Sequence, residues 1–444
     1  MTQLGATEIL AGYVSGIKPG DLPASVINEA RRCVVNFTGC ALGGIDHDVS
    51  KAIAGGLTEF SGPSTASMIG LKRLADPFLA ALYNGTAASA HSFDDTHGEA
   101  IVHAASPVCA ATLAFAQSRG AEGRNFLIAV AAGVEATCRL SKALSVAPAV
   151  GNIAWYQTGV TAGVGSAIAA GILLRLNPKQ MANAIGIAVS QASGTRIMQG
   201  SMAMLMLAGH TAQSGIRAAI LAQNGMEAPA TSIEGKYGHA ELHSITPHLP
   251  WLTDDLGKRH DILSNTYKSY PAGVVLHPVL DACRDLKAQH PEISADSIES
   301  VSVHIHETAV VLTDRANPAT RTEGQVSVQH WTVMGLTSSS LGLPEGMLAV
   351  IQKPANVALR QKVRLVAEKS FDRDAAQVSI TLKSGQMVKS GIRRGCAPMS
   401  DAQIDDKFAG QAAGVLPDAN IRPLAAAIWA LKEDDSAQSL NGLL

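Results

Sequence analysis

The side chains best suited to chemistry lie in one short polar segment within an otherwise apolar stretch of the chain. Residues 91–103 read HSFDDTHGEAIVH, which places Asp94, Asp95 and His103 close together. Clusters of titratable groups are more typical of functional sites than isolated ones are. An imidazole titrates near neutral pH and can take a proton from carbon, provided that nearby donors stabilise the charge that develops. The segment therefore predicts acid–base chemistry on a small molecule.

Two predicted helices flank this segment and must position it. Small-residue spacing predicts one helix over 79–90, and Ser106-Pro107 begins another that runs through 116. The connection faces the amino terminus of the second helix, a place that suits a substrate carboxylate. The alternative is that Asp94 or Asp95 caps that helix and that the histidines belong to a surface loop.

The same residues carry a resemblance to a known family. The passage 84–116, NGTAASAHSFDDTHGEAIVHAASPVCAATLAFA, resembles the signature of the MmgE/PrpD family. The segment YKSYP at 267–271 with His277, and GQVSVQHW at 324–331, are similar to two further family segments. The helix with Lys407-Phe408 is similar as well, so that the likeness covers nearly the whole chain. The family includes 2-methylcitrate dehydratases, cis-aconitate decarboxylases and an iminodisuccinate epimerase.

The resemblance implies a fold, a site and an assembly. The expected fold is mainly α, with a large helical domain, a smaller α+β domain, the site in the cleft between them, and a homodimer. It also implies that no metal and no organic cofactor is needed. The implied catalytic residues are His103, Lys268 and Asp94. The implied substrate-binding residues are Asp95, Thr96, Tyr156, Gln157, Gln329 and His330.

Several positions depart from the family pattern. Ser92 stands where the family usually has an aspartate, while Met204 and Leu207 align with a lysine and a histidine. Tyr156 replaces a histidine that is common in the family. The expected site is therefore less cationic, which indicates a substrate with fewer carboxylates, altered chemistry or lost activity. Arg196 could clamp a carboxylate, although a surface ion pair is the interpretation we favour.

Composition excludes several classes of protein. Apolar residues make up 47% of the 444 residues and charged residues 16%, which is typical of a globular protein with a large core. A net charge of −2 means that there is no excess of positive charge that would favour binding to nucleic acid or to an anionic membrane. The first residues lack a secretory signal, and apolar runs are shorter than the roughly 20 residues of a membrane span, so we expect a cytoplasmic protein. The scattered cysteines, and the pair His304 and His306 without a third ligand, indicate neither disulfides nor a metal site.

Periodicity predicts how the chain is divided. Residues 1–266 and 399–444 are expected to form one discontinuous, all-helical domain, and 267–398 a small α+β domain. Within the small domain, apolar residues alternate over 299–307 and over 377–383, which predicts two strands. The turn after the second strand predicts a hairpin with 387–388, and the remaining pattern predicts helices over 273–288 and 357–368.

Together these observations predict a cofactor-independent lyase. We expect a dehydratase that removes a proton next to a carboxylate of a small hydroxy-polycarboxylate, with His103 and Lys268 sharing the roles of base and charge stabiliser. Three alternatives stay open: an epimerase or isomerase, a decarboxylase of a dicarboxylate, and a non-catalytic carboxylate-binding paralogue.

Overall fold

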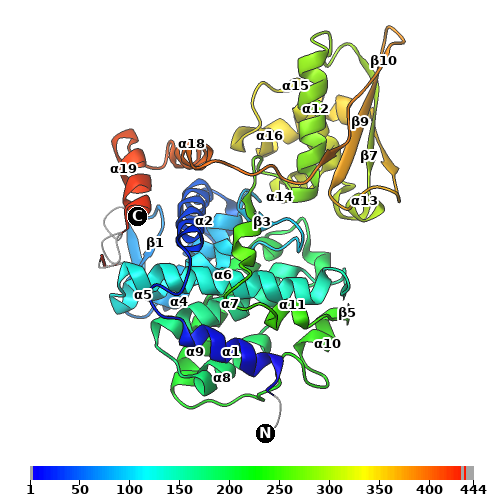
Figure 1. Cartoon of the computed structure of the whole chain (residues 1–444). Coiled ribbons are helices and arrows are strands. Elements are labelled where there is room, and N and C mark those ends of the chain that lie inside the picture. Colours follow the sequence, from blue (N-terminus) through cyan, green and yellow to red (C-terminus); the bar gives the residue numbers. More distant parts are fainter. Residues whose placement is uncertain (1–3, 432–434, 437–444) are drawn as a thin grey trace.

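The computed structural model describes residues 4–431, 435 and 436, and the chain is built mainly from helices, as predicted. Figure 1 shows a large helical part and, at the upper right, a smaller part with a sheet. Each has its own hydrophobic core, one drawn from residues 6–267 and 404–431 and the other from residues 270–388. We call them the helical domain and the small domain. The division predicted at 266/267 and 398/399 stays a prediction, and Tyr267 packs in the first core.

The helical domain is a closely packed bundle whose interior is rich in alanine and glycine. The helices predicted around 79–90 and 106–116 are present as α4 and α5. Most of α7 (Gln157–Leu173), which contains a long apolar run, is buried. The longer helices are α1 (Ala6–Gly16), α2 (Ala24–Gly43), α3 (Asp48–Leu57), α4 (Pro77–Ser89), α5 (Ala105–Arg119), α6 (Gly123–Ser145), α7 (Gln157–Leu173), α8 (Pro178–Val189) and α9 (Met202–Gln223). The shorter ones are α10 (His239–His243) and α11 (Pro250–Thr253).

One close contact between α4 and α9 sets the position of the start of α9. A β carbon at Gly209 of α9 would overlap the carbonyl oxygen of Leu82 on α4, so only glycine lets the two backbones approach this closely. Near the end of α4, the Ser89 hydroxyl donates a hydrogen bond of 2.7 Å to the carbonyl of Leu205. The start of α9 is thereby held against the end of α4.

The helical domain is not purely helical, so the all-α prediction was wrong in this detail. It contains three two-stranded ribbons: β1 (Ala66–Met68) with β2 (Arg73–Ala75), β3 (Asp95–His97) with β6 (Asn265–Tyr267), and β4 (Val150–Gly151) with β5 (Ser244–Thr246). Strands of two or three residues are too short to produce a readable alternation of apolar and polar residues. The β3–β6 ribbon matters most because it brings two distant chain segments together.

The small domain is built on a mixed sheet with the strand order β10-β9-β7-β8, while β11 pairs with β9. The predicted strands are present as β7 (Ile298–Ile305) and β9 (Ala375–Leu382), and the predicted hairpin is present with β10 (Met387–Lys389). The helix predicted over 357–368 was wrong in its second half, because Val363–Ala367 forms β8, parallel to β7. The other elements are α12 (His277–Gln289), α13 (Glu307–Thr313), α14 (Arg321–Gln325), α15 (Val328–Thr337), α16 (Leu348–Ile351), α17 (Pro354–Arg360) and β11 (Arg393–Arg394).

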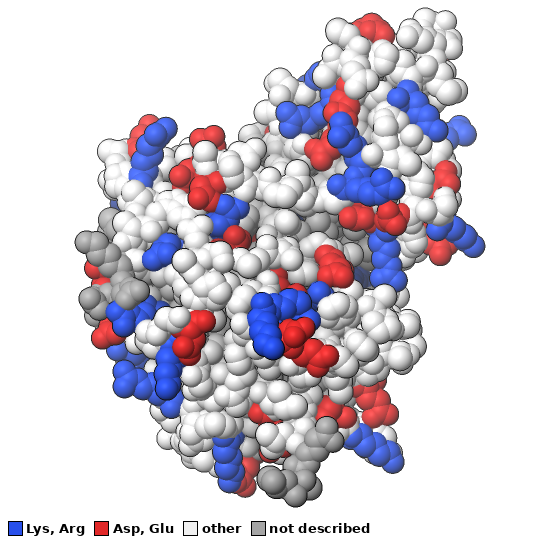
Figure 2. All heavy atoms as spheres, viewed as in Figure 1, with Lys and Arg blue, Asp and Glu red and all other residues white. Residues whose placement is uncertain are grey.

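The chain then returns to the helical domain, as Figure 1 shows in orange and red. The helix α18 (Asp401–Ala412) begins with a capping box formed by Ser400 and Gln403, and both it and α19 (Asp418–Trp429) contact α2. Among the described residues, every helix is either too short or too polar to span a bilayer. On the face drawn in Figure 2, acidic and basic side chains are intermixed.

Candidate active site

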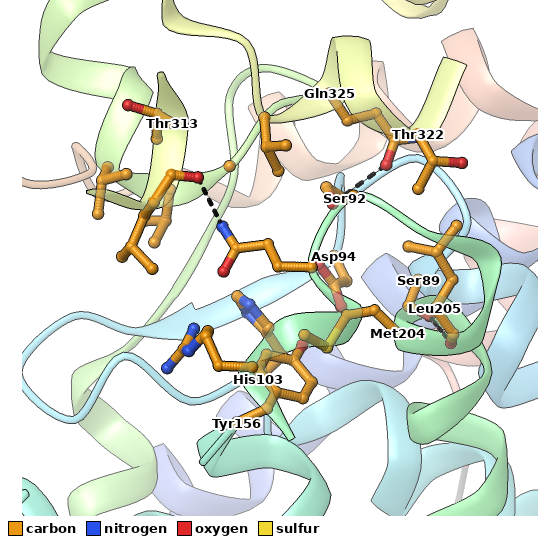
Figure 3. Close-up of a pocket in the computed structure, with 18 of the residues that line it drawn as sticks. Ser89, Ser92, Asp94, His103, Tyr156, Met204, Leu205, Thr313, Thr322 and Gln325 are labelled. Carbon is orange, nitrogen blue, oxygen red and sulfur yellow. Dashed lines mark hydrogen bonds between the residues drawn. The ribbon is translucent and has the colours of Figure 1, made fainter. Parts of the chain in front are cut away.

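A cavity lies between the two domains, and its wall contains Asp94, His103, Tyr156 and Lys268, four of the predicted site residues. In Figure 3, Asp94, His103 and Tyr156 lie on the side of the helical domain, whereas Thr313, Thr322 and Gln325 belong to elements of the small domain. The space among the lining residues is about 850 Å³ and is partly open to solvent.

The β3–β6 ribbon forms a buried ion pair at its end. The Lys268 backbone N–H donates to the Asp94 carbonyl at 3.1 Å, and the Lys268 Nζ donates to Asp94 Oδ1 at 2.6 Å. Both side chains are only 2% exposed. Burial alone would raise the pKa of Asp94, but the charge of Lys268 and its hydrogen bond to the carboxylate hold that pKa below its usual value. The remaining Nζ–H groups of Lys268 can donate to a substrate carboxylate.

His103 is held as a neutral base. Its Nδ1 lies 2.7 Å from the carbonyl oxygen of Asp95, and its backbone N–H donates to the Thr158 hydroxyl at 3.0 Å. A carbonyl oxygen only accepts hydrogen bonds, so Nδ1 carries the proton and Nε2 keeps a free lone pair. Burial and the charge of Lys268 lower the pKa of His103 to about 4, which keeps the imidazole neutral at neutral pH.

Tyr156 completes this side of the cavity. The centre of its ring lies 6.1 Å from that of His103. Burial and the charge of Asp94 raise the pKa of Tyr156, so the phenol keeps its proton and can donate a hydrogen bond.

Asp95 has a structural position, which corrects one expectation from the sequence. Its carboxylate accepts hydrogen bonds from the backbone N–H groups of Ala104, Ala105 and Ser106, at 2.8–3.2 Å, where α5 begins. The anion site at that helix terminus is therefore filled by the protein itself, and a substrate carboxylate does not bind there. Burial and the neighbouring Asp94 raise the pKa of Asp95.

We predict that Asp95→Ala lowers the free energy of unfolding by about 3 kcal/mol, because it leaves buried backbone donors without an acceptor. The matched control is Asp76→Ala, since Asp76 caps α4 from a half-buried position and should cost about 1 kcal/mol. Denaturant unfolding of both variants measures the difference. Equal losses would show that Asp95 does not have this role.

Four other predicted site residues do not line the cavity. Thr96 is buried within β3, and Gln157 accepts a hydrogen bond from Ser141 at 3.3 Å. Gln329 is held inside the small domain, where it donates to Asp314 and accepts from the Arg315 backbone N–H. His330 is buried, with its Nε2 2.9 Å from the Glu345 carbonyl oxygen. The first turn of α15 thus supports the small domain rather than facing the cavity.

Arg196 is the most important residue that the sequence interpretation underrated. It lies in a short 3₁₀ helix (Arg196–Met198) and lines the cavity from a half-buried position, with no carboxylate of the described residues in an ion pair with it. The expected surface ion pair is therefore absent from the described part of the chain. Gly194 and Gly200, on either side of Arg196, adopt positive φ angles. The spacing of these glycines was the signal in the sequence that the segment between them forms an ordered loop. Other polar wall residues that the sequence did not single out are Ser89, Gln199, Ser201, Thr313, Thr322 and Gln325.

The helix α18, near the carboxyl end of the chain, holds the loop before Asp94 in place. Lys407 of α18 is buried, donates to the Phe93 carbonyl at 2.6 Å and lies 4.3 Å from the centre of the Phe93 ring. Burial lowers the pKa of Lys407. Ser92, which lines the cavity, has a φ of 48°, a conformation that a serine adopts only when its surroundings impose it. Lys407 thus helps to fix the backbone that presents Asp94.

Within the described residues, no group of three or more His, Cys, Asp and Glu side chains is placed to hold a metal ion. His304 instead pairs with Glu368 at 2.8 Å, and His306 caps α13.

The chain is similar to known proteins over nearly its whole length. Residues 8–251 match the model of the MmgE/PrpD N-terminal domain, and residues 270–431 match that of the MmgE/PrpD C-terminal domain. A cis-aconitate decarboxylase of Aspergillus terreus is 25% identical over 95% of this chain and 92% of its own length. The cis-aconitate decarboxylase of Mus musculus is 26% identical over 99% of this chain and 93% of its own length. The chain therefore belongs to the MmgE/PrpD family.

Proposed function

We propose that the protein is a lyase that acts on a small carboxylate with more than one carboxyl group, and that it works as a dehydratase. The observation that carries this proposal is the neutral imidazole of His103, whose Nε2 is free, in a cavity wall that also contains the Asp94–Lys268 pair. A neutral base next to buried N–H donors suits proton removal from carbon beside a carboxylate.

The reaction is an elimination of water that begins with removal of a proton from carbon. His103 Nε2 takes the proton from the carbon next to the carboxylate, and the C–H electron pair moves into that carboxylate. Lys268, held in place by Asp94, donates hydrogen bonds to the carboxylate oxygens, where the negative charge grows. The electron pair then forms the C=C bond as the C–O bond at the neighbouring carbon breaks. The imidazolium of His103 returns its proton to the departing hydroxyl group, so that water leaves and the site is restored.

This assignment predicts an unusual pH profile. Because the pKa of His103 is lowered to about 4, the base form persists to low pH, and kcat/KM should stay flat between about pH 5 and about pH 8. The rate should fall only as the pH drops through about 4, when His103 becomes protonated. Steady-state kinetics over this range measure the profile, after the enzyme has been shown to stay folded at each pH. An acidic limb with its midpoint near 6.5, the value of an ordinary histidine, would contradict the assignment.

Decarboxylation is the second candidate, and the relatives' names favour it. It must supply a proton to carbon after CO₂ leaves, and a His103 with a lowered pKa holds no proton on Nε2 at neutral pH. NMR of carboxyl-labelled citrate, methylcitrate and cis-aconitate distinguishes the two reactions. Dehydration or hydration conserves every labelled carbon and interconverts olefinic and hydroxy-acid signals. Release of labelled CO₂ without any such interconversion would replace the dehydratase by the decarboxylase.

Other expectations stay predictions. Epimerisation would use the same first step and would need a second group, such as Lys268, to return the proton from the opposite face of the substrate. A carboxylate-binding paralogue without activity is opposed by the joint presence of His103, Asp94 and Lys268 in one cavity wall. The homodimer, the cytoplasmic location and the independence from cofactors, which the family likeness and the composition suggest, also stay predictions.

A further inference from the structure

The guanidinium group of Arg196 is fixed in the cavity wall. Its Nε donates to the Ile153 carbonyl at 3.3 Å, and its Nη2 donates to the Trp155 carbonyl at 3.1 Å. Its central carbon lies 5.7 Å from the centre of the Tyr156 ring, a distance at which the cation and the ring attract each other. These contacts hold the side chain in place without neutralising its charge.

Arg196 and Lys268 are the two cationic residues among those that line the cavity, and they differ in what balances them. Lys268 is paired with Asp94, whereas Arg196 forms no ion pair with any carboxylate in the described part of the chain. Burial lowers the pKa of Arg196. Arginine nevertheless stays charged in proteins, and its flat, forked group fits a carboxylate with two parallel hydrogen bonds.

Another part of the wall is apolar. Met204 and Leu205 of α9 carry no charge, and Figure 3 shows both beside Asp94 and Ser89. The small domain adds Val274 and Val326 to the lining. A carboxylate against such a surface would lose its hydration without gaining a partner, which is unfavourable, whereas a methyl or other uncharged group gains by being buried there.

We propose that Arg196 binds the second carboxylate of a dicarboxylate substrate whose third substituent is uncharged and lies against Met204 and Leu205. This inference rests on the proposed function, in which the first carboxylate binds at Lys268. It names the substrate class as a dicarboxylate with an apolar arm, and it makes Arg196 and Met204 the residues that determine specificity.

Two probes that differ only in that arm test the proposal. Citraconate and cis-aconitate share the cis-dicarboxylate, but citraconate carries a methyl group where cis-aconitate carries a third carboxylate arm. By isothermal titration calorimetry, the wild-type protein should bind citraconate about 10-fold more tightly or better, because a carboxylate on the apolar wall is desolvated without a partner. Arg196→Gln should weaken citraconate binding by about 30-fold or more through loss of the paired charge-assisted hydrogen bonds. The matched control is Arg217→Gln, an exposed arginine on α9 outside the cavity, which should leave the affinity unchanged.

A second variant changes the preference instead of removing binding. Met204→Lys should strengthen binding of cis-aconitate by about 10-fold, since it supplies a partner for the third carboxylate. Absence of citraconate binding to the wild-type protein, tighter binding of cis-aconitate by the wild-type protein, or an unchanged affinity in Arg196→Gln would overturn the proposal. Citraconate binding that depends on Arg196 without proton exchange in any substrate would instead remove the proposed function and leave this inference standing. Turnover of a dicarboxylate with an unchanged KM in Arg196→Gln would instead overturn this inference and leave the proposed function standing.

Discussion

Replacing His103 by alanine should lower kcat by about 1,000-fold, because the positioned base that takes the proton from carbon is lost. The fold should survive, since the imidazole faces a cavity and is only half-buried. The reaction of whichever carboxylate proves to be the substrate, followed under saturating conditions, measures this loss. Circular dichroism and the unfolding midpoint of the variant check that it is folded.

Two histidines outside the cavity provide the matched controls. His304→Ala and His306→Ala remove imidazoles of the small domain that pair with Glu368 and cap α13, respectively. Their turnover should stay within a few-fold of the wild-type value, because neither group reaches the substrate. Wild-type turnover in His103→Ala would remove His103 from the mechanism.

The second large effect concerns the buried ion pair. Lys268→Met should reduce kcat by about 100-fold or more through loss of the donor to the substrate carboxylate. It should also lower the free energy of unfolding by about 3–5 kcal/mol, because it leaves the buried Asp94 carboxylate without its partner. Steady-state kinetics and denaturant unfolding measure the two effects separately.

A charge-neutral double variant distinguishes stability from chemistry at this pair. Adding Asp94→Asn to Lys268→Met removes the unpaired charge, so most of the lost stability should return while the activity stays low. Recovery of activity together with stability would show that the pair has only a structural role. Combining Lys268→Met with His103→Ala should cost much less than the product of the single effects, since both groups act in one step.

The sequence could predict much of the candidate site because its main cluster is local. Asp94 and His103 lie in one short segment, and the family likeness added Lys268 from a segment far away in the chain. The sequence could not show which of the two carboxylates, Asp94 or Asp95, faces the cavity. Adjacent residues near a strand point to opposite sides, so one carboxylate turns to the cavity and the other to the start of α5. The β3–β6 pairing that decides this joins residues about 170 positions apart and leaves no local pattern.

Other differences between the predicted and the observed positions of residues have similar physical causes. Gln329 and His330 lie in a matching family segment, but their side chains are held by hydrogen bonds within the small domain. Arg196 looks like a surface residue in the sequence, because only the folded loop shows it half-buried and held by backbone carbonyls. The strand β8 was missed because its five residues begin only two residues after a short helix, so the helical pattern was extended too far.

Deuterium uptake from heavy water tests the central claim most directly, namely that His103 removes a proton next to a carboxylate. NMR would follow the carbon-bound protons of citrate, methylcitrate, malate and amino-dicarboxylates in the presence of the wild-type protein and of His103→Ala. We predict that at least one of these compounds exchanges a proton next to a carboxyl group with the wild-type protein, and that His103→Ala abolishes the exchange. Loss of CO₂ from a carboxylate without any such exchange, or equal exchange in both proteins, would contradict the claim.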